Sequence, residues 1–339
     1  MPFNHSIYVA GHTGMIGSAV LRALESQGAP KVITRTHAVL ELTDAAAVNQ
    51  FFAQEKPDYV VLAAGRVGGI VENATYPADF ITENLAIQLN VIRAAHHHGV
   101  KRLVMFGSSC MYPRECPQPM AEEALLTGKL EPTSMAYAAA KIAGVEMCLA
   151  FNRQYGVNRF LPLIPNSTYG PGDNFNEQSG HVLSVLLRRF HAAKLDGAPS
   201  VTLWGNGEPR REFVYADDVA HAVLKLLWMN EEPVQAQTWP MNIGVGSDVS
   251  IRELAQIIAK EVGYTGAIEW DVSKPNGAPQ KLLDSSRMRQ LGWQPHTLLK
   301  EGIHKAYEWY CQQLSTNKND EAVGRAKEVK KAKASEEAL

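Results

Sequence analysis

The chain of 339 residues has few cysteines and no excess of charge of either sign. Its four cysteines, Cys110, Cys116, Cys148 and Cys311, form no CxxC pair, which argues against a structural zinc site. Lys and Arg number 33 and Asp and Glu number 35, so the formal net charge is −2 and no global basic field attracts nucleic acid. We therefore expect neither a metal site nor a nucleic-acid partner.

Long apolar runs are also lacking. The N-terminal MPFNHSIYVAGHTG holds no extended apolar stretch of a signal peptide, and no run approaches the roughly 18–20 residues that span a bilayer. With few cysteines, no signal and no span, the sequence predicts a cytoplasmic protein with free thiols and no membrane contact. Hydrophobic residues make up 45% of the chain, which excludes disorder as the main state and allows a sizeable core.

Short apolar runs alternate with longer amphipathic ones through the first half of the chain. Strands are expected at 6–10, 31–36, 59–64, 102–108 and 158–165, and helices at 15–27, 44–54, 78–98 and 135–155. This alternation predicts an α/β fold, a Rossmann-type doubly wound parallel sheet with a smaller C-terminal α/β substrate lobe.

The pattern changes after Tyr169, where a Gly- and Asn-rich segment begins. Helices are expected at 181–193, 250–262 and 298–313 with a short strand at 201–204, whereas strand 213–215 and helix 217–228 are expected to join the main sheet. We predict a dinucleotide-binding domain of residues 1–170 and about 212–242, and a lobe of about 171–211 and 243–315. Residues 316–339 lack aromatic residues, so a charged, disordered tail or a frayed helix is expected.

A glycine-rich loop follows the first predicted strand and opens the first predicted helix. Gly11 permits a tight turn, Gly14 lets the backbone approach a pyrophosphate, and Gly17 lets the helix pack closely on the strand. The helix N-terminus adds amide donors and a positive dipole, which favours a bound dinucleotide over an empty glycine turn. The second strand ends in Arg35 and His37 with no acid for a ribose hydroxyl, which favours NADPH and leaves NADH possible. A solvated strand-end charge is the alternative role for Arg35.

Tyr137 and Lys141 stand four residues apart, so they share one face of the helix predicted at 135–155. A cation beside the phenol lowers its pKa, which would let Tyr137 exchange a proton with a carbonyl or carbinol oxygen. Ser108 and Ser109 end a predicted parallel strand, at the edge where doubly wound folds bind ligands. Together these residues predict a reductase or a nucleotide-sugar epimerase.

Cys110 and His181 can add a second kind of chemistry. A thiol and an imidazole are a suitable base and acid for moving a proton next to a ketone, and Cys110 directly follows the two serines. Spacing alone does not separate this interpretation from a buried cysteine and a solvated histidine.

The glycine-loop spacing is typical of the short-chain dehydrogenase/reductase superfamily, and longer segments narrow the match. Over about residues 5–315 the chain resembles the family of GDP-L-fucose synthases in the segments GHTGMIGSA, LAAGRVGGI, TYPADFITEN, GSSCMYP, EPTSMAYAAAKIAG, YGPGDNF, HVLSVLLRRFH, VTLWGNGEPRREF, VSIRELAQIIAKEVGY and QKLLDSSRMRQLGW. This family carries out 3,5-epimerisation and NADPH-dependent 4-reduction of GDP-4-keto-6-deoxy-D-mannose to GDP-L-fucose. The resemblance implies the same two-stage reaction here.

The resemblance also implies roles for individual residues. Cys110 would remove the C3 and C5 protons, and His181 would return a proton on the opposite face. Ser108 or Ser109 and Tyr137 would stabilise the enolate oxygen, and Tyr137 would protonate the C4 oxygen as hydride arrives. The implied cofactor residues are Gly11, Thr13, Gly14, Met15, Ile16, Gly17, Arg35, His37, Leu42, Ala63, Ala64, Lys141, Pro165, Ser167, Thr168 and His181.

A GDP-linked 4-keto sugar is the implied substrate, held by Arg189, Trp204, Arg211, Asn276 and Lys281. Structural roles stay open for three of them: a helix-face charge for Arg189, lobe core for Trp204 and a loop salt bridge for Arg211. By analogy with the superfamily, a homodimer through helices 78–98 and 135–155 is expected.

The chain departs from the family pattern at several of these positions. Thr13 and His37 stand where arginines are usual, so we expect a modest preference for NADPH over NADH. Ser167, Asn276 and Gln280 also depart from the usual residues, which leaves a related GDP-4-keto sugar as an alternative substrate. A plain reductase, an NAD-retaining nucleotide-sugar 4-epimerase and a non-catalytic NADP-binding regulator are three further functions that the sequence leaves open.

Overall fold

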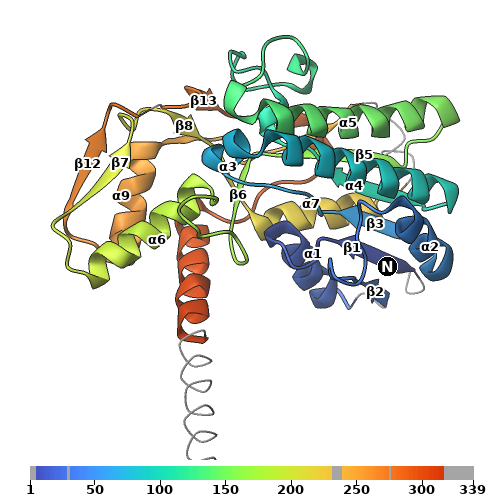
Figure 1. Ribbon diagram of the computed structural model, residues 1–339, viewed down its shortest axis with the longest axis horizontal. Helices are drawn as coiled ribbons and strands as arrows, with labels where there is room; N and C mark the ends of the chain where they lie inside the picture. Colours follow the sequence, from blue (N-terminus) through green and yellow to red (C-terminus); the bar gives the residue numbers. More distant parts are fainter. Residues whose placement is uncertain (1–4, 29–30, 231–238, 275, 317–339) are drawn as a thin grey trace, which may run out of the picture.

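The computed structural model describes residues 5–28, 31–230, 239–274 and 276–316. Six parallel strands form the main sheet, in the spatial order β10-β5-β4-β3-β1-β2 (Figure 1). They are β1 (Ser6–Ala10), β2 (Lys31–Ile33), β3 (Tyr59–Leu62), β4 (Arg102–Phe106), β5 (Phe160–Pro165) and β10 (Met241–Ile243). This sheet confirms the predicted α/β fold class.

Helices cover both faces of the main sheet, which explains why its central strands are continuous apolar runs. On one face, α1 (Met15–Ser26) and α7 (Ala216–Trp228) share a core with alternate residues of the strands. On the other face lie α2 (Ala45–Glu55), α4 (Pro77–His97) and α5 (Met135–Tyr155). The carboxyl ends of the strands therefore meet at one edge between two helical layers, where ligands of this fold class bind.

A third core lies in the C-terminal lobe. There α6 (Val182–Leu195), α9 (Ile251–Val262) and a helix over 299–316 pack around the paired strands β7 (Ser200–Trp204) and β12 (Ala267–Asp271). Between this core and the main sheet, three two-residue strands form a small sheet in the order β11-β8-β13 (Figure 1). They are β11 (Val249–Ser250), β8 (Arg210–Arg211) and β13 (Gln280–Lys281).

One strand prediction is wrong. Strand β9 (Phe213–Tyr215) pairs with β6 (Ser167–Tyr169) in a separate two-stranded sheet and does not join the main sheet. The sixth strand of the main sheet is instead β10, which follows α7. A three-residue apolar strand packs equally well in either place, so its composition does not choose its neighbour.

Several element boundaries and short elements also differ from the predictions. Strands β2, β3 and β4 each end two or three residues before the predicted boundary, so Arg35 and Ser108 lie in loops. The short helices α3 (Ile70–Thr75) and α10 (Ser286–Gln290) were not predicted. The two-domain division stays a prediction; Met288 and Trp293, assigned to the lobe, pack in the core of α1 and α7. The predicted tail, from residue 317 on, lies outside the described residues.

One described helix, Pro132–Tyr155, is long and apolar enough to cross a bilayer by length and composition alone. This corrects the expectation that no segment approaches that length. Buried residues make up 44% of its apolar window, and the helix packs along α4. It has the features of a core helix.

Candidate active site

The glycine loop lies between β1 and α1 at the carboxyl edge of the sheet. Gly11 has a φ of +78°, and a Cβ there would lie 2.6 Å from the amide nitrogen of Ala64, just after β3. A Cβ on Gly17 would lie 2.1 Å from the carbonyl oxygen of Gly11. Both positions therefore require glycine, and both keep the backbone of the loop close to the neighbouring strand.

This loop fits the phosphates of a dinucleotide. Gly14 caps α1 without a side-chain hydrogen bond, so the first amides of the helix, at Met15 and Ile16, are not covered by a capping side chain. Gly172, in the loop after β6, approaches the same turn, because a Cβ on it would lie 3.5 Å from the Cα of Met15. Most of the remaining predicted cofactor residues lie at the ends of adjacent strands: Ala63 and Ala64 after β3, Pro165 at the end of β5, and Ser167 and Thr168 in β6. The other two lie elsewhere: Thr13 is exposed in the glycine loop, and Leu42 is buried beside α2.

The two side chains predicted near a 2′-phosphate, Arg35 and His37, are both paired with glutamates. Arg35 forms an ion pair with Glu55 of α2 and stacks on Phe51, its guanidinium carbon 5.4 Å from the ring centre. His37 pairs with Glu41 and is largely exposed. The carboxylates beside both side chains oppose the approach of a 2′-phosphate, and this part of the predicted cofactor site stays a prediction.

The structure brings Tyr137, Lys141 and Ser108 together at the start of α5. The Lys141 ammonium lies 5.8 Å from the centre of the Tyr137 ring, and Ser108 hydrogen-bonds the phenol. Burial lowers the pKa of Lys141 to about 8. The expectation of a lowered phenol pKa is wrong: burial and the nearby Cys110 thiolate raise the pKa of Tyr137 despite its hydrogen bond with Ser108. The phenol is therefore held as a neutral proton donor.

Cys110 lies in a single helical turn, Ser109–Met111, directly after the loop that follows β4. Its backbone amide donates to the Ser108 hydroxyl oxygen at 3.3 Å, and its Sγ lies 3.6 Å from the Lys281 Nζ. Burial raises the pKa of the thiol, but the charge of Lys281 and hydrogen bonds from Ser108, Lys281 and Ser134 outweigh it. The pKa of Cys110 consequently lies below its ordinary value.

His181 occupies the N-cap position of α6 and is exposed. The residues before it lie against the loop that follows β3, because the Gly69 amide donates to the Ser179 carbonyl at 2.8 Å. Burial raises the pKa of Asp173, and the neighbouring His181 partly opposes this rise. The described contacts do not join His181 to Cys110, so its predicted role as the opposite acid stays a prediction.

The predicted GDP-sugar residues form a continuous series along the lobe. Lys281 contacts Cys110, Arg211 interacts with the same thiol through its charge, and a Cβ on Gly277 would lie 3.5 Å from the Arg211 guanidinium. The adjacent Asn276 side chain accepts the Asn206 amide at 2.9 Å, two residues beyond Trp204. The side chain of Trp204 is 52% exposed, so it is not lobe core, and Lys274 lies 5.8 Å from its ring centre.

Within the described residues, Arg189 is the member of this set that forms an ion pair with a carboxylate. It contacts a carboxylate oxygen of Glu177 at 3.4 Å and the Thr202 carbonyl at the same distance. Arg211, in contrast, forms no ion pair with any residue that the structure describes, so a loop salt bridge does not account for it.

Three contributors were missed by sequence reasoning. Ser134, the residue before α5, hydrogen-bonds Cys110. Asn84 of α4 lies near Lys141, because a Cβ on Gly65 would lie 2.7 Å from the Asn84 Oδ1 and 3.6 Å from the Lys141 Nζ. Glu212 is fully buried and organises the strand that carries Lys281. The segments EPTSMAYAAAK and TYPADFITEN contain the first two, but no spacing rule connects them to the thiol or the lysine.

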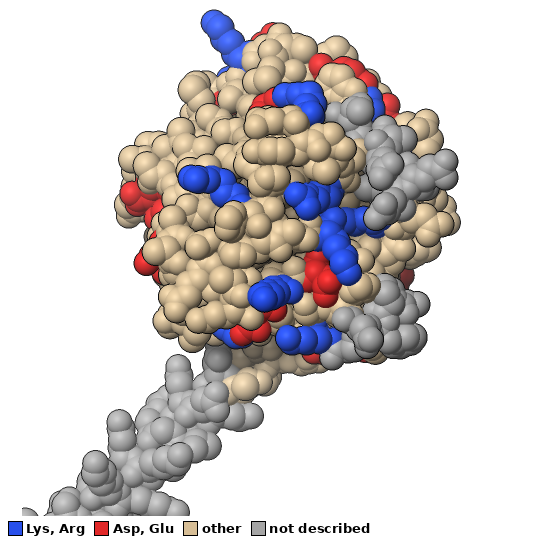
Figure 2. Space-filling view, turned by 90° about the vertical axis from the view of Figure 1, so that its right-hand side faces the viewer, with Lys and Arg blue, Asp and Glu red and all other residues tan. Residues whose placement is uncertain are grey.

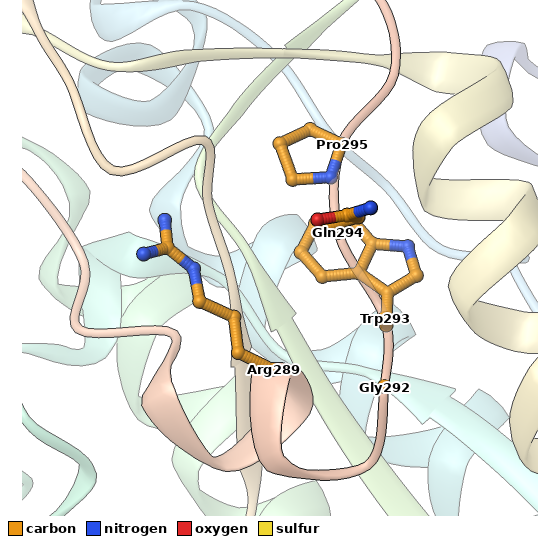
Figure 3. A pocket seen from close by; sticks show the side chains of 5 residues that line it. All are labelled: Arg289, Gly292, Trp293, Gln294 and Pro295. Atoms are coloured by element: carbon orange, nitrogen blue, oxygen red, sulfur yellow. The ribbon is translucent and has the colours of Figure 1, made fainter.

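Surface features away from this site give no competing function. Basic and acidic side chains are interspersed on the face shown in Figure 2. A surface hollow of about 470 Å³ lies between Arg289 and residues 292–295, with Trp293, Gln294 and Pro295 on one side and Arg289 on the other (Figure 3). None of the predicted site residues lines this hollow. The described part of the chain contains no cluster of three or more His, Cys, Asp or Glu side chains able to hold a metal.

Known proteins resemble this chain over nearly its whole length. Residues 7–244 match the NAD dependent epimerase/dehydratase family. The chain is 50% identical over 310 residues to GDP-L-fucose synthase 1 of Arabidopsis thaliana, covering 91% of this chain and 94% of that protein. It is 49% identical over 310 residues to GDP-L-fucose synthase of Escherichia coli K12, covering 90% and 96%.

A solved structure extends the comparison to the fold. The GDP-mannoheptose C4 reductase from Campylobacter jejuni with NADP bound is 39% identical, with a TM-score of 0.83 over 91% of this chain and 99% of that one. Its match covers both the main sheet and the lobe. With the glycine loop, the Ser108–Tyr137–Lys141 group and Cys110 in one place, the chain belongs to the NAD dependent epimerase/dehydratase family and, within it, to the GDP-L-fucose synthases.

Proposed function

We propose that the protein converts GDP-4-keto-6-deoxy-D-mannose to GDP-L-fucose as a bifunctional 3,5-epimerase and NADPH-dependent 4-reductase. The observation that carries this proposal is the position of the Cys110 thiol, which lies beside the Ser108 and Tyr137 hydroxyls of a reductase site and next to Lys281. A plain reductase does not need a base at that position. The relatives named GDP-L-fucose synthase support the same substrate.

The epimerase half uses the thiol as a base. The 4-keto group acidifies the protons on C3 and C5, and the Cys110 thiolate would remove them. The electron pair moves toward the C4 oxygen, where the hydroxyls of Ser108 and Tyr137 can stabilise the enolate. His181, on the loop held against the β3 loop, would return a proton to the opposite face.

The reductase half uses the opposite side of the same pocket. NADPH supplies the hydride for C4 when it is bound. The amides at the start of α1, at Met15 and Ile16, would hold its pyrophosphate, and Lys141 would hold the ribose near the nicotinamide. Tyr137 keeps its proton because its pKa is raised, so it can deliver that proton to the C4 oxygen.

A second function has a specific observation in its favour. The Campylobacter jejuni relative is a GDP-mannoheptose C4 reductase, and this chain is 39% identical to it. A reductase without epimerase activity is therefore the second candidate. An NAD-retaining 4-epimerase is less consistent with Cys110, because 4-epimerisation needs no base for C3 and C5.

We also propose a homodimer through α4 and α5, located in the cytoplasm. The two helices pack side by side and leave Leu89 of α4 40% exposed. All four cysteines are free thiols, as in a reducing compartment. Light scattering of the protein and its Leu89→Arg variant tests the interface; the proposal requires a dimer that the variant weakens, and a monomeric parent protein would overturn it.

The proposed activity is tested by incubating the protein with GDP-4-keto-6-deoxy-D-mannose and NADPH and identifying the product by NMR. GDP-L-fucose is the expected product. A C4-reduced sugar with unchanged C3 and C5 would support the plain reductase instead. No NADPH oxidation with this sugar would overturn the substrate assignment and direct attention to Ser167, Asn276 and Gln280.

A further inference from the structure

We propose that Lys281 is a positioning residue that holds Cys110 as a thiolate in the free enzyme, before any substrate binds. The resemblance implies only that Lys281 holds the GDP-sugar. The consequence for catalysis rests on the proposed epimerase function, but the ion pair between the lysine and the thiol does not.

The contact itself is short and has no competitor. The Lys281 Nζ lies 3.6 Å from the Cys110 Sγ. In the described part of the chain, no carboxylate forms an ion pair with Lys281. Burying an ammonium group without a negative partner costs free energy, and a thiolate at this distance supplies the negative charge.

The backbone of Lys281 is fixed on both sides, which limits where its ammonium can go. Its strand β13 pairs with β8 in register with Arg211. The Lys281 carbonyl accepts the Glu212 amide at 3.2 Å and the Asn166 side-chain amide at 3.3 Å. Two residues further on, the Leu283 amide donates to the buried Glu212 carboxylate at 2.9 Å. This network fixes the backbone from which the Lys281 side chain reaches the thiol.

All the charged and titratable groups around Cys110 favour or tolerate a negative sulfur. Lys281 approaches from β13, Arg211 from β8 and the neutral Tyr137 phenol from α5, while Ser108 and Ser134 donate hydrogen bonds. The carboxylate of Glu131 interacts with Arg211. Lys281 is the one cation of the two that contacts the sulfur directly.

The balance of the proton-transfer step explains why this pairing matters. The C–H bond at C3 or C5 breaks, the proton forms an S–H bond, and the electron pair passes to the C4 oxygen. Lys281 is not consumed; it fixes the fraction of Cys110 present as the base at neutral pH, since only the thiolate accepts the proton.

The test measures the free thiol without substrate or cofactor. The full-length protein and its Lys281→Met, Lys281→Arg and Lys260→Met variants are treated with iodoacetamide between about pH 6 and pH 10, and alkylation of the Cys110 peptide is followed by mass spectrometry. Lys281→Met is expected to move the midpoint up by about one pH unit, with an about tenfold slower reaction at pH 7. Lys281→Arg should largely restore the original midpoint, and the exposed-lysine control Lys260→Met should not change it.

An unchanged midpoint in Lys281→Met would overturn the proposal and leave Lys281 as a substrate ligand only. If that variant does not fold, as judged by circular dichroism, Lys281→Gln carries the same expectation. Because no sugar is present, failure of the proposed enzyme activity leaves this result intact.

Turnover then separates the two roles of the lysine. If Lys281 only holds the GDP-sugar, saturating substrate restores deuterium exchange at C3 and C5 in Lys281→Met, since only KM has changed. If it maintains the thiolate, exchange at saturating substrate remains about tenfold slower at pH 7 and recovers as the pH rises.

Discussion

The two sides of the candidate site hold their cations in opposite ways. On the cofactor side, Arg35 and His37 are each paired with a glutamate, Glu55 and Glu41. On the lobe side, Lys281 has no carboxylate partner in the described residues and contacts the Cys110 sulfur. Basic side chains near the predicted 2′-phosphate position are thus paired with carboxylates, whereas Lys281 faces the thiol.

This difference gives substitutions on the two sides different expected effects. A cation already neutralised by a glutamate adds little attraction for a phosphate, so the change to Thr13 and His37 in the chain falls on a weakly charged surface. A cation facing a thiol changes the protonation state of that thiol. We therefore expect substitutions on the lobe side to affect proton transfer, and substitutions on the cofactor side to affect mainly cofactor choice.

The largest effect is expected when the base itself is removed. Cys110→Ser should slow deuterium exchange at C3 and C5 by about 10³-fold, because a serine hydroxyl is not ionised beside Lys281, while hydride transfer to C4 persists. NMR in D₂O with NADPH oxidation followed in parallel measures both. Cys116→Ser is the matched control, and full exchange in Cys110→Ser would remove the thiol from the mechanism.

Removal of the predicted acid should have the next largest effect. His181→Ala is expected to slow epimerisation by about 10²-fold and to change the rate of reduction much less, since Tyr137 protonates the C4 oxygen. The same assay in D₂O measures the rates of epimerisation and of reduction. Normal exchange in this variant would return His181, which is exposed and caps α6, to a surface role.

The pH dependence of reduction probes the cofactor side. Burial lowers the pKa of Lys141 to about 8, so Lys141 carries its charge below that pH and loses it above. The rate of C4 reduction should fall by about tenfold per pH unit above pH 8. Stopped-flow measurement of NADPH oxidation gives the profile, and a flat rate up to about pH 10 would contradict a charged Lys141 in the reduction step.

The lowered pKa of Lys141 also makes the free energy of unfolding depend on pH. Burial disfavours the charged form of Lys141. The folded state therefore binds fewer protons than the unfolded state between about pH 8 and pH 10.5, the ordinary pKa of a lysine. Stability should consequently rise with pH across this window, and Lys141→Met should remove that rise.

The smallest effect is expected at the neutralised cations. Glu55→Gln releases Arg35 from its ion pair and should raise the preference for NADPH over NADH by about threefold. The unaltered protein should show a preference below about a hundredfold, or about 2.7 kcal/mol. The ratio of kcat/KM values for the two cofactors measures both, and a preference above that limit would contradict the view that these cations are neutralised.

Five of the six strands of the main sheet and their covering helices followed from the sequence, because the strands are continuous apolar runs and the helices are amphipathic; β10 was not predicted. The helix predicted at 44–54 is α2, capped by Asp44, which accepts the amides of Ala46 and Ala47, and the span Met135–Tyr155 was predicted correctly. The position of β9 did not follow, because three apolar residues do not specify a partner strand. The six residues of α3 were missed because they are too short for a helical period.

The residues of the site also fall into two groups, those set by local structure and those that depend on contacts between distant segments. Motif spacing placed the glycine loop and the pair Tyr137 and Lys141, which depend on local structure. The contact between Lys281 and Cys110 joins residues 171 positions apart and depends on how β13 pairs with β8. The pair of Arg35 with Glu55 likewise depends on how α2 packs on the sheet, and no local pattern reports it.

The central claim is that one pocket carries both proton abstraction and hydride transfer. The most direct test is to run the unaltered protein with GDP-4-keto-6-deoxy-D-mannose and NADPH in D₂O and to compare deuterium in the product with NADPH consumed. The account predicts deuterium at both C3 and C5 of a C4-reduced product. A C4-reduced product without deuterium at either carbon would contradict it, and would leave Cys110 and Lys281 outside the reaction.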